Sequence, residues 1–252
     1  MPIVNNSLMS IKKFNLVLLL SLFTCCLAGQ SSSNKSQNRE DYYGHKLNFG
    51  FFLGINKTNF SITTVNNWSA IAGDSLKTIL SSPSTGFNLG IVSEMRLHQY
   101  ATLRFLPDIA FGQRNLEYHF AGVDTFDIIK KVESTFLNFP LNFKIRSKRF
   151  GNFAAYMLGG GKYTLDLASQ KDVNNGGIPL ALQVVKLAKN DWAIEAGAGV
   201  DFFLPYFKFG IELKTSMGIK NMLIRDPNPS VLSSTIDNLR SKVFLISFTF
   251  EG

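Results

Sequence analysis

Charged side chains recur at every second position along much of the chain, opposite large apolar side chains. In the segment 207–220, Lys208, Glu212 and Lys214 share one parity. Phe209 and Ile211 share the other. Alternate residues of a strand point to opposite faces, so this period predicts strands with one charged and one apolar face. Since the charged face carries both signs, the chemistry we expect there is ion pairing, by Glu94, Arg96, Arg104, Asp108, Lys144, Arg146, Lys162, Asp166, Glu195, Asp201, Lys208, Glu212 and Lys214.

Metal and phosphate motifs are weak. The three histidines, His45, His98 and His119, have no second ligand at a spacing typical of metal sites. The run from Gly159 to Lys162 lacks both the spacer between glycines and the hydroxyl residue after the lysine that a phosphate-binding loop needs. We therefore expect no cofactor, no metal and no small-molecule substrate.

The chain offers a single candidate set for hydrolysis. Some small membrane barrels are lipid or peptide hydrolases with polar residues at the rim, and His119 with Asp124 and Asp127 would be such a set. The competing interpretation, ordinary solvated loop residues, is the one we favour. We expect a protein that is not an enzyme.

The two-faced pattern predicts strands at about 46–60, 85–97, 100–113, 134–146, 152–168 and 241–250, and a two-stranded hairpin at 192–220 that turns at Leu204-Pro205. Each hairpin strand has about a dozen residues, against about 5 to 6 in globular proteins and about 9 to 11 for a strand crossing a bilayer. Pro107 and Pro140 fall inside strands, where the missing donor indicates a bulge or an unpaired position.

The predicted connections alternate between long and short along the whole chain. Outer-membrane barrels have short turns on the periplasmic side and long loops outside. Lipid supplies no hydrogen bonds, so a sheet that spans the bilayer must close. We predict an all-β fold, an eight-stranded antiparallel up-and-down transmembrane β-barrel. A barrel of this size is filled by its own side chains, which excludes a wide pore.

The N-terminal region reads as a targeting segment. Lys12 and Lys13 precede an apolar run and the small residues Ala28 and Gly29, the pattern of a secretory signal peptide over 1–29. Lipidation at Cys25 or Cys26 is the alternative processing. The polar stretch that follows cannot bury enough surface to fold and predicts a flexible periplasmic leader at 30–45, followed by the barrel domain at 46–252.

Composition fits a membrane location better than a nucleic-acid partner. The chain is 45% hydrophobic and 17% charged, with a formal charge of +8. Loss of Lys12 and Lys13 with the signal leaves 8 − 2 = +6. The basic residues are scattered along strands and turns, which argues against nucleic acid. The expected partners are outer-membrane lipid and lipopolysaccharide, with both termini in the periplasm.

Four segments resemble strands of the PorT family of small outer-membrane barrels, found in bacteria with type IX secretion. They are FLNFPLNFKI (136–145), AAYMLGGGKYTLDL (154–167), WAIEAGAGVDFFL (192–204) and FKFGIELKTSMGIKNML (207–223). The resemblance runs from about Leu47 to the C-terminus, and its SMGIKNML ending is closest to PorT itself. It implies a non-enzymatic component or assembly factor of type IX protein secretion that contacts other secretion-system proteins.

Two other functions stay open from the sequence. One is a general porin-like or structural barrel not tied to secretion, and the other is the rim hydrolase. External loops such as 221–240, with a turn-rich piece at 225–229, are candidate contact surfaces because binding residues concentrate on loops carried by rigid scaffolds.

Overall fold

The computed structural model describes residues 38–39, 42, 44–66, 76–120, 126–169, 185–225 and 231–252. The predicted signal peptide and most of the predicted leader lie outside these residues. The strands are β1 (Leu47–Thr64), β2 (Leu76–Arg96), β3 (Ala101–Phe105), β4 (Asp108–Phe120), β5 (Phe126–Arg146), β6 (Phe153–Asp166), β7 (Asn190–Phe203), β8 (Lys208–Gly218) and β9 (Ile236–Glu251). A one-turn helix, α3 (Val231–Ser234), precedes β9.

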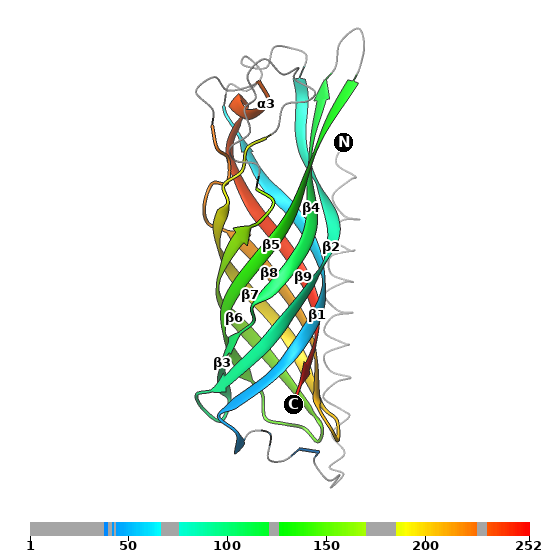
Figure 1. Ribbon diagram of the computed structural model, residues 1–252, viewed down its shortest axis with the longest axis vertical. Coiled ribbons are helices and arrows are strands. Elements are labelled where there is room, and N and C mark those ends of the chain that lie inside the picture. The colour runs from blue at the N-terminus through cyan, green and yellow to red at the C-terminus, as the bar shows by residue number, and fades with distance from the viewer. Residues whose placement is uncertain are drawn as a thin grey trace, which may run out of the picture. The chain divides into compact units, whose positions relative to one another are not determined.

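The strands form one closed antiparallel sheet. Sequential neighbours pair along the chain except β3 and β4, which both lie between β2 and β5 and pair with each of them. The sheet closes because β1 also pairs with β9, from Gly50↔Glu251 to Thr64↔Ile236. Figure 1 shows the resulting tilted barrel, with α3 at one end and the C-terminus at the other. We call the first the long-loop end and the second, where β2–β3, β5–β6 and β7–β8 connect, the short-turn end. The prediction of an all-β antiparallel barrel is confirmed. No helix of the described residues is long and apolar enough to cross a membrane.

The two interior prolines meet at one irregular position. The third predicted strand is divided there into β3 and β4, because Leu106 and Pro107 leave the ladder. Pro140 stays within β5 opposite Lys162, and its carbonyl accepts a hydrogen bond from the Leu106 amide at 3.2 Å. A proline has no N–H to donate, so the missing donor of β5 lies beside the gap between β3 and β4.

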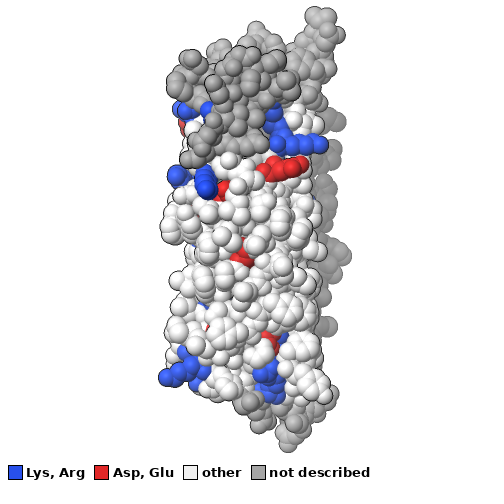
Figure 2. Space-filling view, in the orientation of Figure 1, with Lys and Arg blue, Asp and Glu red and all other residues white. Residues whose placement is uncertain are grey.

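The outward face of the barrel is apolar over a broad band. On β1, Phe51 and Leu53 are 50% and 48% exposed, and on β7 Ile194 is 60% exposed. Figure 2 shows this band as almost free of charged atoms, with Lys and Arg gathered near both ends. Side chains of this kind are stable on the outside only against lipid, so we call the band the membrane belt.

Several strands extend farther toward the long-loop end than the sequence predicted. β2 begins at Leu76 and β5 at Phe126. The long connection expected between the third and fourth predicted strands is largely paired sheet, from Gly112↔Ser134 to Phe120↔Phe126. Only residues 121–125 join β4 to β5, so the predicted alternation of long and short loops fails at this connection.

The longer strands build a part of the barrel beyond the membrane belt, which we call the extension. It comprises β1 from Lys57, β2 before Thr85, β4 from Gln113, β5 up to Glu133 and β9 up to Lys242. Its outward positions are mostly polar. The predicted strands stopped where the outward apolar pattern stopped, which is why these segments were expected to be loops.

Candidate functional site in the barrel interior

The inward positions near the short-turn end carry a buried ion-pair cluster. Arg104 of β3 is fully buried and lies 2.6 Å from Glu212, 3.2 Å from Glu251 and 3.6 Å from Glu94. Burying a charge is costly unless it is paired and hydrogen-bonded, so each of these groups depends on the others. The short-turn cluster consists of Glu94, Arg104, Lys144, Asp201, Lys208, Glu212 and Glu251.

Two lysines cross-link the same cluster from other strands. Lys208 of β8 lies 2.8 Å from Glu251 and 3.0 Å from Glu94. Lys144 of β5 lies 2.8 Å from Asp201 of β7. These contacts join β2, β3, β5, β7, β8 and β9 across the lumen. Each carboxylate therefore lies against at least one fixed cation, which suits a structural role better than proton transfer.

An aromatic side chain fits this cluster because a glycine faces it. Tyr156 of β6 donates its hydroxyl to Glu212 at 3.0 Å, and its ring lies opposite Gly199 of β7. A Cβ on Gly199 would lie 2.5 Å from the Tyr156 ring. The close approach thus requires glycine at this position.

A second group of charges lies in the middle of the lumen. Glu195 of β7 accepts from Asn142 at 3.0 Å and lies 3.3 Å from Lys214 and 3.5 Å from Lys162. Asp108 of β4 accepts hydrogen bonds from Asn88 at 2.6 Å and from Asn138 at 2.9 Å. Lumen groups here are satisfied partly by amides and partly by ion pairs.

Arg114 of β4 lies at the start of the extension. Its guanidinium is between the rings of Phe60 and Phe136, at 4.4 and 4.8 Å from their centroids, and 3.6 Å from Asp166. A cavity of about 40 Å³, with Arg114, Asp108 and Lys162 among its lining residues, opens in the middle of the lumen. Its size and polar walls suit a few water molecules, not a substrate.

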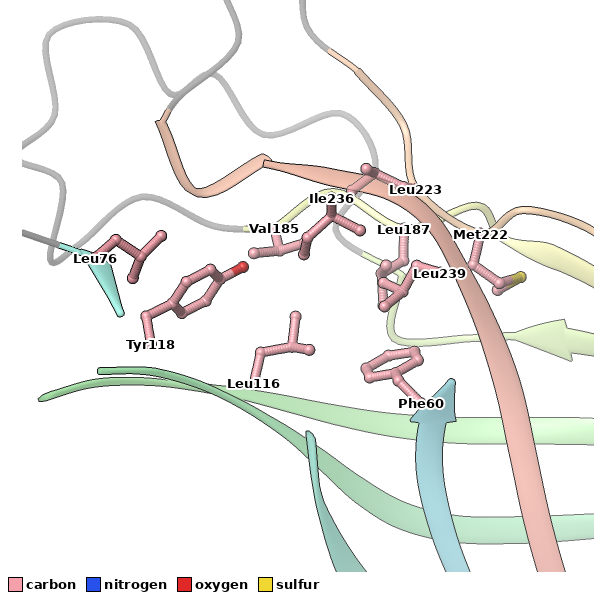
Figure 3. Packing of buried hydrophobic residues seen from close by; sticks show 10 residues of the cluster. All are labelled: Phe60, Leu76, Leu116, Tyr118, Val185, Leu187, Met222, Leu223, Ile236 and Leu239. Atoms are coloured by element: carbon pink, nitrogen blue, oxygen red, sulfur yellow. The ribbon is translucent and has the colours of Figure 1, made fainter. Parts of the chain in front are cut away.

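Beyond Arg114, the lumen of the extension is mostly apolar. Figure 3 shows Phe60 of β1 pointing toward Leu187 and Leu239, and Tyr118 of β4 pointing toward Val185. We call this packed group the apolar cap; its members are Phe60, Leu76, Leu116, Tyr118, Val185, Leu187, Met222, Leu223, Ile236 and Leu239. Backbone pairing holds the segments around Leu187 and Leu223 over the barrel, through Ala188 N to Met222 O at 2.8 Å and Ile224 N to Lys186 O at 3.0 Å.

The short-turn mouth is occupied by residues that were expected to be a flexible leader. Asn38 donates its backbone N–H to Asn152 at 2.8 Å and its side-chain amide to the Phe203 carbonyl at 3.0 Å. Tyr42 is fully buried and donates to Glu251 at 2.9 Å. The leader thus differs from the prediction at these residues, because polar side chains find hydrogen-bond partners at the mouth that composition does not reveal.

The structure brings together most of the residues that the sequence assigned to one network. Glu94, Arg104, Lys144, Asp201, Lys208 and Glu212 belong to the short-turn cluster, and Asp108, Lys162, Glu195 and Lys214 lie above it. Asp166 contacts Arg114. Arg146 is buried but donates to the Gln99 carbonyl at the short-turn end. Arg96 lies at the end of β2, partly exposed, and forms no ion pair within the described residues.

Sequence reasoning missed Glu251, Arg114 and Tyr42. Glu251 shares the parity of Ser247 and Thr249, so extending the last predicted strand by one residue would have found it. Arg114 lies one residue beyond the predicted end of its strand, on the inward parity of Asp108. No sequence signal marks Tyr42.

The candidate hydrolase set is not assembled in the described residues. His119 lies 3.9 Å from Glu117 of the same strand. Asp124 and the side chain of Asp127 lie outside what the structure describes. No group of three His, Cys, Asp or Glu residues in the described ranges is arranged to hold a metal ion.

Comparison with known proteins decides the family. A model of the outer membrane protein beta-barrel domain matches residues 30–223. This chain belongs to that family. The match and the apolar outer face together make it a protein of the bacterial outer membrane. A comparison with curated protein sequences gave no match.

Solved structures that resemble the chain are small outer-membrane proteins. OprG from Pseudomonas aeruginosa is 14% identical, with 82% of this chain and 94% of OprG covered and a TM-score of 0.40. Ail of Yersinia pestis, solved with the heparin analogue sucrose octasulfate, is 12% identical over 82% of this chain and 100% of Ail, with a TM-score of 0.35. AlkL, solved in DMPC bilayers, is 11% identical over 89% of this chain and 95% of AlkL, with a TM-score of 0.34. None of these assigns an activity to the present chain.

Proposed function

We propose that this barrel is a non-conducting, non-enzymatic component of type IX protein secretion that acts through contacts with other proteins of the system. The proposal that the barrel does not conduct rests on the obstruction of its lumen. Arg104 and Lys208 tie together Glu94, Asp201, Glu212 and Glu251, which come from four strands, across the short-turn half. Transport through such an interior would require several buried ion pairs to separate at once.

The apolar cap supports the same conclusion from the other end. Phe60, Leu116 and Leu239 fill the lumen of the extension, and an apolar constriction excludes ions by dewetting. With both halves obstructed, the surfaces left for function are the ends and the outer wall.

The link to secretion is the likeness of segments 136–145, 154–167, 192–204 and 207–223 to PorT. These segments form much of β5 to β8 and supply four members of the short-turn cluster, Lys144, Asp201, Lys208 and Glu212, together with Tyr156, which donates to Glu212. The PorT-like segments thus supply part of the cluster that obstructs the lumen.

Deletion of the gene tests the secretion role. Cargo of the type IX system should accumulate in the periplasm of the deletion strain, and the wild-type gene should restore export. Normal export in the deletion strain would refute the role in secretion and leave the fold untouched. If export is lost in the deletion strain, co-purification from native membranes would identify the proteins that the barrel contacts.

A second candidate, a porin-like barrel with a narrow polar path, is favoured by the polar cavity of about 40 Å³. Planar-bilayer recordings of the purified protein separate it from our proposal. We expect no stable conductance, and a reproducible open channel would refute the non-conducting barrel. The non-enzymatic part is tested by His119→Ala, which should leave the lipid A profile of the cells unchanged.

A further inference from the structure

Three basic side chains form an outward-facing group where the membrane belt gives way to the extension. Lys57 of β1 and Arg240 and Lys242 of β9 are all exposed. In the pairing of these two strands, Lys57 lies opposite Phe244, Lys242 opposite Asn59, and Arg240 opposite Ser61. We call Lys57, Arg240 and Lys242 the basic triad.

The spacing within the basic triad suits phosphate. Lys57 and Lys242 are diagonal neighbours on adjacent strands, which places them about 7 to 8 Å apart. Lys242 and Arg240 are two residues apart on one strand, or roughly 7 Å. Long flexible basic side chains at these separations reach a shared oxyanion, and arginine offers a bidentate fork for it.

The register places uncharged residues around the basic triad. Thr85 of β2 lies opposite Lys57, and Met217 of β8 lies opposite Lys242. None of the three basic residues forms an ion pair with another residue of the described part of the chain. Asp237, farther along β9, is paired with Arg225 at 3.2 Å.

On the opposite side of the barrel, an exposed lysine has acidic neighbours instead of uncharged ones. Lys131 of β5 is exposed and lies opposite Asn115, with Glu133 two residues along the same strand. Glu117 lies opposite Ile129, which places it diagonally from Lys131. Acidic neighbours there compete with any anionic ligand for the lysine.

An apolar wall lies directly beside the basic triad on the membrane side. Phe244, next to Lys242 on the same face of β9, is 45% exposed, and Ile55 of β1 and Met217 of β8 are each 55% exposed. The combination of a cationic patch with an adjoining apolar wall matches an amphiphile that has a phosphorylated head and acyl chains.

We propose that the basic triad binds the phosphates of an acylated, phosphorylated glycolipid, with lipid A as its simplest form, while the acyl chains lie along Ile55 and Phe244. The long loops of outer-membrane barrels face outward, which places the basic triad in the headgroup region of the outer leaflet. The inference depends on the membrane location of the barrel and goes beyond its role in secretion.

Lipid A titration of the full-length barrel in detergent, read by native mass spectrometry, tests this site. The triple variant Lys57→Gln/Arg240→Gln/Lys242→Gln should bind on the order of 100-fold more weakly than wild type, given roughly fivefold per basic residue. The matched control removes the same charge at the short-turn end, in Lys46→Gln/Arg96→Gln/Lys148→Gln, and should bind as wild type does. Heat-dependent gel migration verifies that both variants fold.

Two further probes identify the ligand class. Dephosphorylated lipid A should bind wild type no better than it binds the triple variant. Inorganic phosphate should not displace lipid A, because it lacks the acyl chains. Equal affinity of wild type for phosphorylated and dephosphorylated lipid A would overturn the proposal without any variant. Displacement by inorganic phosphate, or equal losses in the triple variant and its control, would also overturn it.

Discussion

The membrane belt and the extension use the same strands with opposite polarity. In the belt, β1 turns Phe51 and Leu53 outward and Asn48 and Asn56 inward. A few residues farther, the same strand turns Lys57 and Ser61 outward and buries Phe60. The backbone ladder continues unbroken through this change, as the register from Gly50↔Glu251 to Thr63↔Asn238 shows.

The reversal follows the solvent. Lipid surrounds the belt, so apolar side chains lie outside and charges gather in the lumen. Water surrounds the extension, so the hydrophobic effect drives apolar side chains into the lumen, as in a soluble β-barrel. One closed sheet thus holds an ionic interior and an apolar interior in series, and substitutions in the two should fail for different reasons.

The largest effect is expected from the ionic interior. Arg104→Met removes the cation shared by Glu94, Glu212 and Glu251 and leaves buried carboxylates under-compensated, which should cost about 3 to 5 kcal/mol of folding free energy. Urea unfolding in detergent, followed by gel migration, measures this. Arg96→Met is the matched control at the mouth and should change stability by less than about 0.5 kcal/mol. Equal losses of stability in Arg104→Met and Arg96→Met would mean that the short-turn cluster does not stabilise the barrel through Arg104.

The apolar interior should lose folding free energy when a side chain of the apolar cap is shortened. Leu239→Ala, in the apolar cap, removes packing against Phe60 and leaves a cavity, at a cost of about 2 to 5 kcal/mol. The same unfolding assay applies, and Ser61→Ala on the exposed side of β1 serves as its control. A loss below about 0.5 kcal/mol for Leu239→Ala would show that the extension does not depend on its core.

The boundary between the two regions can be located with a single added charge on the outer face. Leu53→Lys places an ammonium group near the middle of the belt and should cost about 2 to 4 kcal/mol, whereas a lysine beyond the interface costs about 0 to 1. Ser61→Lys, on the same face of β1, places the lysine beyond the interface and should cost about 0 to 1 kcal/mol. Unfolding in lipid vesicles measures both, and similar costs at the two positions would remove the boundary we draw between Ile55 and Lys57.

This reversal also explains what the sequence could predict. Period-two alternation of Phe, Leu and Ile with charged residues located the belt portion of every strand, because a lipid-facing wall must be apolar throughout. The same rule ended the predicted strands too early. Beyond Lys57 and Phe111 the alternation continues with the faces exchanged, and a polar outward residue such as Asn115 resembles a loop.

The interior site was predictable by parity but not in its pairing. Inward parity identified Arg104 and Lys208, yet which carboxylates they contact depends on barrel stagger and on side-chain reach across the lumen. Tyr42 and Asn38 precede the strands, so no periodicity applies to them. Their positions follow from partners such as Glu251 and Asn152, which become neighbours only once the barrel closes.

The smallest effect should come from the residue that closes the short-turn mouth. Tyr42→Phe removes the hydroxyl that donates to Glu251 at 2.9 Å and keeps the ring against Phe203. Loss of a hydrogen bond to a charged acceptor costs about 1.5 to 3 kcal/mol. Burial, followed by the nearby Glu251 carboxylate, raises the pKa of the Tyr42 hydroxyl well above its ordinary value of 10.0.

The unfolded chain therefore loses the Tyr42 proton first as the pH rises, so deprotonation favours unfolding. The stabilisation from this group is fully present below about pH 10 and is lost as the pH climbs toward the folded-state pKa. The stability difference between wild type and Tyr42→Phe should accordingly stay constant up to about pH 10 and shrink above it. A difference that is independent of pH throughout would show that the hydroxyl is hydrated, and that the ionic interior opens to water at the short-turn end.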